Sequence, residues 1–147
     1  MASVFISSVI PASSEDVWEK IRDFNGLPRW HPVVRDSRIQ DGLHPDQVGC
    51  IRDFRLQNGD RITEQLVGLS DYDMTTTYTI LESPMPLTGY VATLRLTPIT
   101  DGNRTFAEWS AEFDCAEEDE QGLVDGIGND VFQAGFDALK RHFGQGS

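Results

Sequence analysis

A run of alternating segments separated by short turns constrains the fold of this chain more than any other feature. Apolar and polar residues alternate within each segment, which is the pattern of a strand with one buried face. All but one of the connections are short, and short connections join antiparallel neighbours. We therefore predict an antiparallel meander with strands near residues 48–56, 61–70, 73–81, 88–98 and 104–115.

Two strands and two short helices are predicted before this meander. Residues 3–10 alternate, are rich in β-branched side chains and end at a proline. Ser13 can cap a helix whose apolar residues return at helical spacing through Phe24, and Asn25–Gly26 is expected to end it. Residues 27–32 are short and bounded by proline, which favours one helical turn before a strand over residues 33–41.

The chain ends in a long predicted helix, over residues 118–143. Acidic residues precede it and basic residues lie in its last turn, as the helix dipole favours. The elements together predict an α+β fold with a strongly twisted antiparallel sheet of six or seven strands. The apolar stripe of the helix contains Val124, Ile127, Val131, Phe132, Phe136, Leu139 and Phe143.

Composition indicates one free-standing domain over residues 1–147. The formal net charge of −12 argues against nucleic acid or an anionic membrane as a partner. Residues 1–5 have no basic segment and no long apolar run, so we expect no signal peptide, no membrane span and a cytoplasmic location. Cys50 and Cys115 have no CxxC spacing and are expected to be reduced thiols rather than a disulfide.

Two charged residues, Arg52 and Glu64, lie in phase with the apolar residues of their strands. Because successive side chains alternate between faces, both charges are predicted to point to the buried face. An unpaired buried charge costs several kcal/mol, so each must meet the other, a hydrated cavity or a ligand. One alternative is an internal ion pair with no further role, although an apolar pair of similar volume is often as stable.

The turn between the two strands decides whether these charges meet. A two-residue turn at Asn58–Gly59 sets apolar residues against polar ones. A three-residue loop over residues 57–59, closed by a left-handed glycine, instead pairs Phe54 with Ile62 on one buried face. We predict this second register, because it keeps the apolar residues together and makes the two charges direct neighbours.

The inner face of the predicted sheet combines an apolar lining with a few converging polar groups, which is the composition of a small-molecule site. The polar groups are Arg52, Glu64 and Tyr90, with the Tyr78 hydroxyl and the Trp109 indole. Further ligand contacts are expected from Trp30, Phe54, Ile62, Leu66, Tyr78, Ala92, Leu94, Trp109, Phe113, Ile127 and Val131. Leu56 and Ile80 are expected on the same face.

Sequence motifs for other chemistries are absent. There is no GxSxG, HExxH, P-loop or CxxC, and Gly126–Gly128 lacks the setting of a dinucleotide fingerprint. His31, His44 and His142 have no ligand-like spacing, so we expect neither a metal nor a cofactor. His31, in a proline-bound turn at the rim of the site, is expected to be a surface or hinge residue rather than a base.

Glycines at positions 122, 126, 128 and 135 lie in or near the final helix, and each interior glycine costs about 1 kcal/mol relative to alanine. Close packing of the helix on the sheet, or a kink, is one explanation. The other is that the missing side chains leave room for a ligand between helix and sheet.

The whole pattern resembles the helix-grip order of the START and birch-pollen-allergen (SRPBCC) superfamily, in its polyketide cyclase/dehydrase-like branch. The resemblance implies a curved sheet wrapped around the C-terminal helix. Similar blocks occur in plant lachrymatory-factor synthases and, more weakly, in abscisic-acid receptors. The most specific blocks are Asp23–Phe24, Trp30–Val33, Val48–Arg52, Thr63–Leu66, Tyr90–Leu94 and Glu108–Trp109.

The resemblance also implies roles for three residues. In the synthase-like members an arginine, a glutamate and a tyrosine at the matching positions serve a sulfenic-acid rearrangement that involves proton transfer; here these are Arg52, Glu64 and Tyr90. The receptors carry a longer gating loop where this chain has only residues 57–59, so hormone gating is not implied. This fold hosts carriers, receptors and enzymes alike, so membership predicts a pocket better than a reaction.

Three functions remain open at this point. The first is a cofactor-free enzyme, cyclase/dehydratase-like or isomerase-like, in which Glu64 is the general acid or base, Arg52 stabilises an anionic oxygen and Tyr90 donates a hydrogen bond. The second is a carrier or sensor that uses the same residues to orient a mostly apolar ligand. The third is an interaction module with a vestigial cavity.

Overall fold

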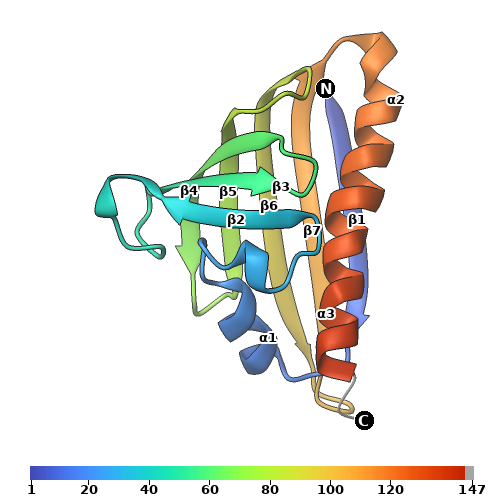
Figure 1. The fold of residues 1–147 in the computed structure, drawn as a ribbon. Helices are drawn as coiled ribbons and strands as arrows, with labels where there is room; N and C mark the ends of the chain where they lie inside the picture. Colours follow the sequence, from blue (N-terminus) through green and yellow to red (C-terminus); the bar gives the residue numbers. More distant parts are fainter. Residues whose placement is uncertain (145–147) are drawn as a thin grey trace.

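Seven antiparallel strands form one curved sheet in the computed structural model, which describes residues 1–144 (Figure 1). The order across the sheet is β1-β7-β6-β5-β4-β3-β2, so the meander is confirmed and the first strand pairs with the last. The strands are β1 (Ala2–Ile10), β2 (Val34–Ile39), β3 (Ile51–Leu56), β4 (Arg61–Ser70), β5 (Thr75–Glu82), β6 (Leu87–Ile99) and β7 (Arg104–Cys115).

The β3–β4 hairpin has the predicted register. The Leu56 amide donates to the Asp60 carbonyl at 2.8 Å, and Gly59 has a φ of +94°. A residue other than glycine is strained at this φ, so the three-residue loop depends on Gly59. Arg52 is directly opposite Glu64 as a result.

The first helix, α1 (Ser14–Ile21), begins where the sequence predicts but ends earlier. The Ser13 hydroxyl accepts a hydrogen bond from the Asp16 amide at 3.2 Å, which confirms the cap. Beyond Ile21 the Asp23 carboxylate accepts the Asn25 amide at 2.9 Å, a local turn that competes with the helix. Phe24 is therefore buried in this turn and not on the helix, so the expected end at Asn25–Gly26 is wrong.

The next segment contains a single helical turn, η1 (Leu27–Arg29), as predicted. Strand β2 is shorter than expected, because a second turn, η2 (Gln40–Gly42), follows it directly. Asp41 and Gly42 in that turn have φ values of 60° and 67°, which a strand cannot contain.

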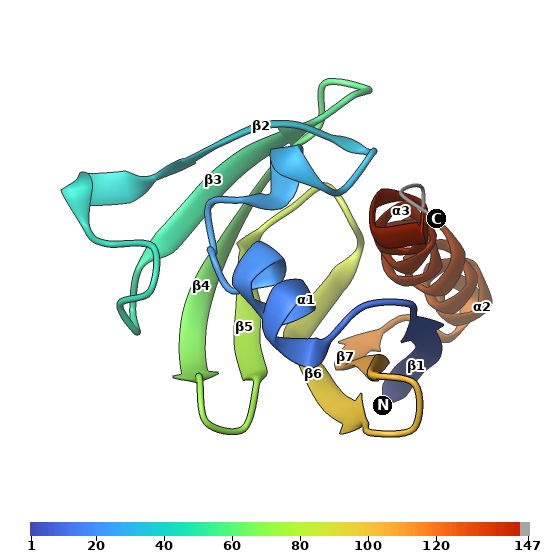
Figure 2. The same cartoon turned by 90° about the horizontal axis from the view of Figure 1, so that it is seen from below.

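The C-terminal helix contains a segment that periodicity did not predict. It consists of α2 (Glu117–Gly126), the π-helical segment η3 (Ile127–Gln133) and α3 (Ala134–Gly144). Figure 2 shows the sheet curving from β1 to β2, with α1 and the C-terminal helix on its concave side. This is the arrangement that the resemblance implied. No helix within residues 1–144 is long and apolar enough to cross a bilayer.

The core lies between the concave face of the sheet and these helices. Trp109 of β7 stacks on Phe132 of η3, with ring centroids 4.5 Å apart. Phe132, Phe136 and Leu139 are fully buried, whereas Val124, Val131 and Phe143 at the margins of the helix stripe are half-buried. Cys50 and Cys115 are both free, as predicted.

Candidate functional site

A cavity of about 120 Å3 lies between the concave face of the sheet and the C-terminal helix. Strands β3 to β7 supply its floor, and η3 closes it from the helix side. Most of the lining is apolar, and Arg52, Glu64, Tyr78 and Tyr90 form a polar group within it; His31 and Asp60 are its other polar side chains. Of the residues expected from the sequence, it contains Arg52, Phe54, Ile62, Glu64, Tyr78, Tyr90, Trp109, Ile127 and Val131.

The polar group centres on the ion pair between Arg52 and Glu64. The Arg52 Nε and Nη2 atoms donate to Glu64 Oε1 at 2.8 and 2.6 Å, and the two side chains are only 7% and 8% exposed. Arg52 Nη1 donates to the Phe24 carbonyl at 3.2 Å. The Arg52 guanidinium also lies 3.9 Å from the centre of the Phe24 ring and 4.7 Å from that of Tyr78. The arginine is thus held rigidly by hydrogen bonds and aromatic faces.

The two oxygens of Glu64 have different surroundings. Both hydrogen bonds from Arg52 end on Oε1, and Oε2 has no hydrogen-bond partner within residues 1–144. Burial raises the pKa of this carboxyl, and the adjacent Arg52 charge opposes the rise without cancelling it. A carboxyl whose pKa is raised holds a proton more readily, and its free Oε2 atom is available to accept one from a ligand.

Two tyrosines lie beside this carboxyl. Trp109 Nε1 donates to the Tyr78 hydroxyl at 3.1 Å, and the Tyr78 and Tyr90 rings are 6.3 Å apart. Burial first, and then nearby negative charge, raise the pKa of both phenols well above their ordinary value. Both hydroxyls therefore stay protonated at neutral pH and can act as hydrogen-bond donors.

His31 is buried, so its expected surface position is wrong. It is 2% exposed and lines the cavity. Its Nε2 atom donates to the Val131 carbonyl of η3 at 2.7 Å, because Nδ1 accepts the Val33 amide at 3.3 Å. Burial lowers the pKa of His31, so the ring is neutral. Strand periodicity could not identify it, because it follows an irregular turn.

Several residues predicted as ligand contacts are buried beside the cavity without lining it. These are Trp30, Leu66, Ala92, Leu94 and Phe113. Leu56 and Ile80, expected on the inner face, do line it. Sequence reasoning missed a group from turns and loops, where no alternation marks a buried face: Leu27, Val33, Asp60, Pro84 and Met85. Val34, the first residue of β2, was also missed, and His31, expected only at the rim, lines the cavity too.

The glycines of the C-terminal helix were expected to permit either close packing or space for a ligand, and different glycines fit each explanation. A Cβ at position 135 would lie 3.0 Å from both His31 and Trp109, so Gly135 permits close packing. Gly122 and Gly126 have open space, and both line a surface groove of about 470 Å3. This groove shares Val33, Leu56, Met85, Ile127 and Val131 with the cavity, so these five side chains form the wall between cavity and groove.

No group of histidine, cysteine or carboxylate side chains within the described part of the chain is arranged to hold a metal ion.

Comparison with known proteins identifies the family. Residues 1–144 match the family described as polyketide cyclase / dehydrase and lipid transport. Among solved structures, the protein XoxI from Bacillus cereus is 31% identical, with 97% of this chain and 96% of that chain covered and a TM-score of 0.88. A protein from Thermobifida fusca is 32% identical, with 99% and 95% covered and a TM-score of 0.89.

A more distant structure shows the same fold. Major latex-like protein 151 from Panax ginseng is 15% identical, with 97% of each chain covered and a TM-score of 0.78. No curated protein matches the chain. The resemblance noted in the sequence is confirmed: the chain has the helix-grip fold and belongs to the polyketide cyclase/dehydrase and lipid transport family.

Proposed function

We propose that this protein binds a small, mostly apolar molecule in the cavity and moves a proton on it, as a cyclase/dehydratase-type or isomerase-type enzyme. The observation that carries the proposal is the free Oε2 of Glu64 in the lining of a mostly apolar cavity. The family and fold support hydrophobic ligand binding in general.

The size of the cavity limits the ligand. A cavity of about 150 Å3 in another protein holds benzene, and this one measures about 120 Å3. A compact single-ring molecule of about the size of benzene fits the cavity as it stands. A larger ligand requires the five-residue wall, which includes Met85 and Val131, to move toward the groove.

In the proposed reaction, Glu64, Arg52 and the two tyrosines have different roles. Glu64 Oε2 takes a proton from a carbon next to a carbonyl and returns it elsewhere on the same molecule, so no oxidant or reductant is consumed. Arg52 has five N–H bonds, of which three are engaged, so two can face the developing oxyanion. Tyr90 or Tyr78 donates a further hydrogen bond, and the apolar wall excludes water.

A carrier or sensor is the second proposal, and the ion pair itself favours it. Arg52 already neutralises Glu64 and is clamped between aromatic rings. A neutralised and rigid ion pair is well suited to orient a carbonyl or hydroxyl group of a ligand without reacting with it.

The experiment that separates the two uses cyclohex-2-enone, a compact apolar ring with exchangeable protons next to a carbonyl. We expect the wild-type protein in D2O to accelerate deuterium incorporation, followed by NMR, and Glu64→Gln to abolish the acceleration. Glu112→Gln, on the exposed face of β7, is the matched control and should retain it. Arg52→Leu should also abolish it.

Two other outcomes are informative. Saturable binding with chemically unchanged ring and no exchange supports the carrier and contradicts the enzyme. Full activity in both Glu64→Gln and Arg52→Leu contradicts the site assignment. Native mass spectrometry of freshly purified protein, with identification of any small molecule that co-purifies, would name the ligand class directly.

A further inference from the structure

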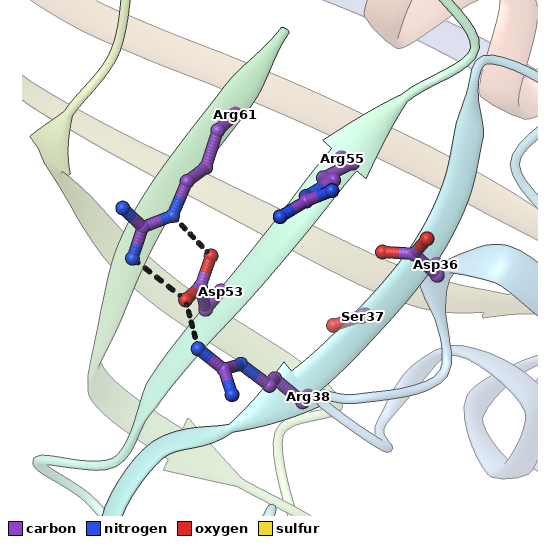
Figure 3. Close-up of a pocket in the computed structure, with 6 residues that line it drawn as sticks. All are labelled: Asp36, Ser37, Arg38, Asp53, Arg55 and Arg61. Carbon is purple, nitrogen blue, oxygen red and sulfur yellow. Dashed lines mark hydrogen bonds and ion pairs between the residues drawn. The ribbon is translucent and has the colours of Figure 1, made fainter. Parts of the chain in front are cut away.

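A second cluster of charged side chains lies on the convex face of β2, β3 and β4, behind the cavity. It surrounds an open hollow of about 580 Å3 (Figure 3). Asp53 and Arg55 alternate along β3 with the cavity residues Arg52 and Phe54, so the two sets point to opposite faces. The lining consists of Asp36, Ser37, Arg38, Asp53, Arg55 and Arg61.

The register of the sheet places like charges opposite each other in this cluster. Arg55 of β3 is directly opposite Arg61 of β4, and Asp36 of β2 is on its other side. Like charges directly opposite on neighbouring strands destabilise a sheet. An anion bound between the two arginines would relieve this repulsion.

The buried carboxylate of Asp53 does not neutralise the cluster, because its single charge is shared by Arg61 and Arg38 and does not reach Arg55. Arg61 Nε and Nη2 donate to its two oxygens, each at 2.8 Å, and Arg38 Nη2 donates to Oδ2 at 3.2 Å. The Asp53 side chain is 6% exposed, whereas those of Arg61 and Arg38 are 53% and 77% exposed. The buried Asp53 carboxylate thus fixes the orientation of the exposed Arg61 and Arg38 guanidinium groups.

Arg55 is left without a partner. Its guanidinium makes no hydrogen bond or ion pair within residues 1–144, and in Figure 3 it lies between Arg61 and Asp36 with no dashed line. The ion pair of Asp36 is with Arg35, at 3.4 Å. The hollow therefore holds a surplus of positive charge on a chain whose net charge is −12.

We propose that this hollow binds a small molecule carrying linked phosphate groups, with anionic oxygens held between the guanidinium groups of Arg55 and Arg61. A planar guanidinium matches phosphate oxygens in a bidentate manner. Arginines on three adjacent strands span about 10 Å, which suits two linked phosphates better than one carboxylate. The net charge of the chain opposes an anionic membrane surface as the source of these groups.

The test is a titration with pyrophosphate, followed by 1H–15N NMR in about 20 mM salt, where screening is weak. We expect saturable shifts confined to residues 36–38, 53–55 and 61. Arg55→Gln should weaken binding about tenfold, as loss of a charge-assisted contact predicts. Arg95→Gln, an exposed arginine on β6 with no ion pair within the described residues, is the matched control and should bind as the wild type does.

Three results of the pyrophosphate titration would overturn the proposal. They are shifts that do not saturate, equal weakening in Arg55→Gln and Arg95→Gln, and unchanged affinity in Arg55→Gln. A hexaglutamate peptide is the competing ligand, and tighter binding of this peptide than of pyrophosphate would overturn the phosphate assignment. Arg55 is directly opposite both Arg61 and Asp36, so loss of its charge removes one repulsion and one attraction. The thermal stability of Arg55→Gln should therefore stay close to that of the wild type, which separates lost binding from unfolding.

Discussion

Consecutive residues of β3 form two ion pairs with different surroundings. Arg52 points inward to Glu64, where both partners are buried. Asp53 points outward, where a buried carboxylate meets two exposed arginines. Desolvation opposes the first pair, whereas the arginines of the second keep most of their hydration. The net contribution of the inner pair to stability is therefore small while both partners are present, but removal of one partner leaves a buried charge and is costly.

Asp53→Asn should lower the free energy of unfolding at pH 7 by about 1–2 kcal/mol, after allowance for screening of the exposed arginines. Hydrogen bonds from Arg61, and then from Arg38, outweigh burial and lower the pKa of Asp53 to about 2, below about 3.9 in an unfolded chain. The native state thus releases the proton more readily. The stabilisation is present above about pH 4 and is lost as the pH falls toward 2.

Urea denaturation between neutral and acid pH measures this effect. Asp101→Asn, in the exposed β6–β7 turn, is the control and should follow the wild type. Equal acid sensitivity of Asp53→Asn and the wild type would contradict the assignment.

Arg52→Leu should lower the free energy of unfolding by about 3–5 kcal/mol, because it leaves a buried carboxyl without its cation. Adding Glu64→Leu should recover most of that loss, since an apolar pair of similar volume is often as stable as a buried ion pair. Denaturation of the wild type, both single variants and the double variant gives the comparison. No recovery in the double variant would show that the ion pair serves the fold alone.

At the scale of elements, the C-terminal helix combines close packing with a local change of helix type. Segment η3 is π-helical, and such segments are frequent at functional sites. His31 donates to the Val131 carbonyl in this segment and so links the turn after α1 to the helix. The wall between cavity and groove contains two η3 residues, Ile127 and Val131, so its position depends on this link.

Gly135→Ala and Gly122→Ala should have opposite effects on the free energy of unfolding. A Cβ at position 135 would meet His31 and Trp109 at 3.0 Å and Trp30 at 3.1 Å, so we expect overpacking to cost about 1–3 kcal/mol. A Cβ at position 122 meets nothing within 4 Å, so helix propensity should stabilise that variant by up to about 1 kcal/mol. Thermal denaturation of the pair checks this, and equal effects would mean that close packing does not explain Gly135.

In the molecule as a whole, each face of the curved sheet carries one of the two candidate sites. The concave face carries an apolar cavity with a buried ion pair, and the convex face carries an arginine cluster on an otherwise acidic protein. Strand β3 contributes to both, because its side chains alternate between the faces.

Salt should stabilise the protein at neutral pH. The net charge of −12 implies repulsion within the folded state, and about 0.5 M NaCl should raise the free energy of unfolding by about 1 kcal/mol through screening. Near the sequence pI of about 4.4 the net repulsion vanishes, so the gain should disappear there. Calorimetry at the two pH values measures the difference, and destabilisation by salt at pH 7 would show that attractive pairs dominate.

Sequence reasoning alone predicted the meander, the register of the β3–β4 hairpin and the position of Arg52 directly opposite Glu64. These features depend on side-chain alternation and turn geometry, which act over a few residues. The same local reasoning located the Ser13 cap, and the resemblance of short blocks identified the family.

The π-helical segment, the burial of His31 and the division of inner-face residues between cavity lining and core were established by the tertiary structure alone. Leu66 and Ile62 alternate in the same way along β4, yet only Ile62 lines the cavity. These features depend on contacts between distant parts of the chain, as between His31 and Val131, which are 100 residues apart. Alternation shows which face a side chain occupies, but packing across that face decides what it meets there.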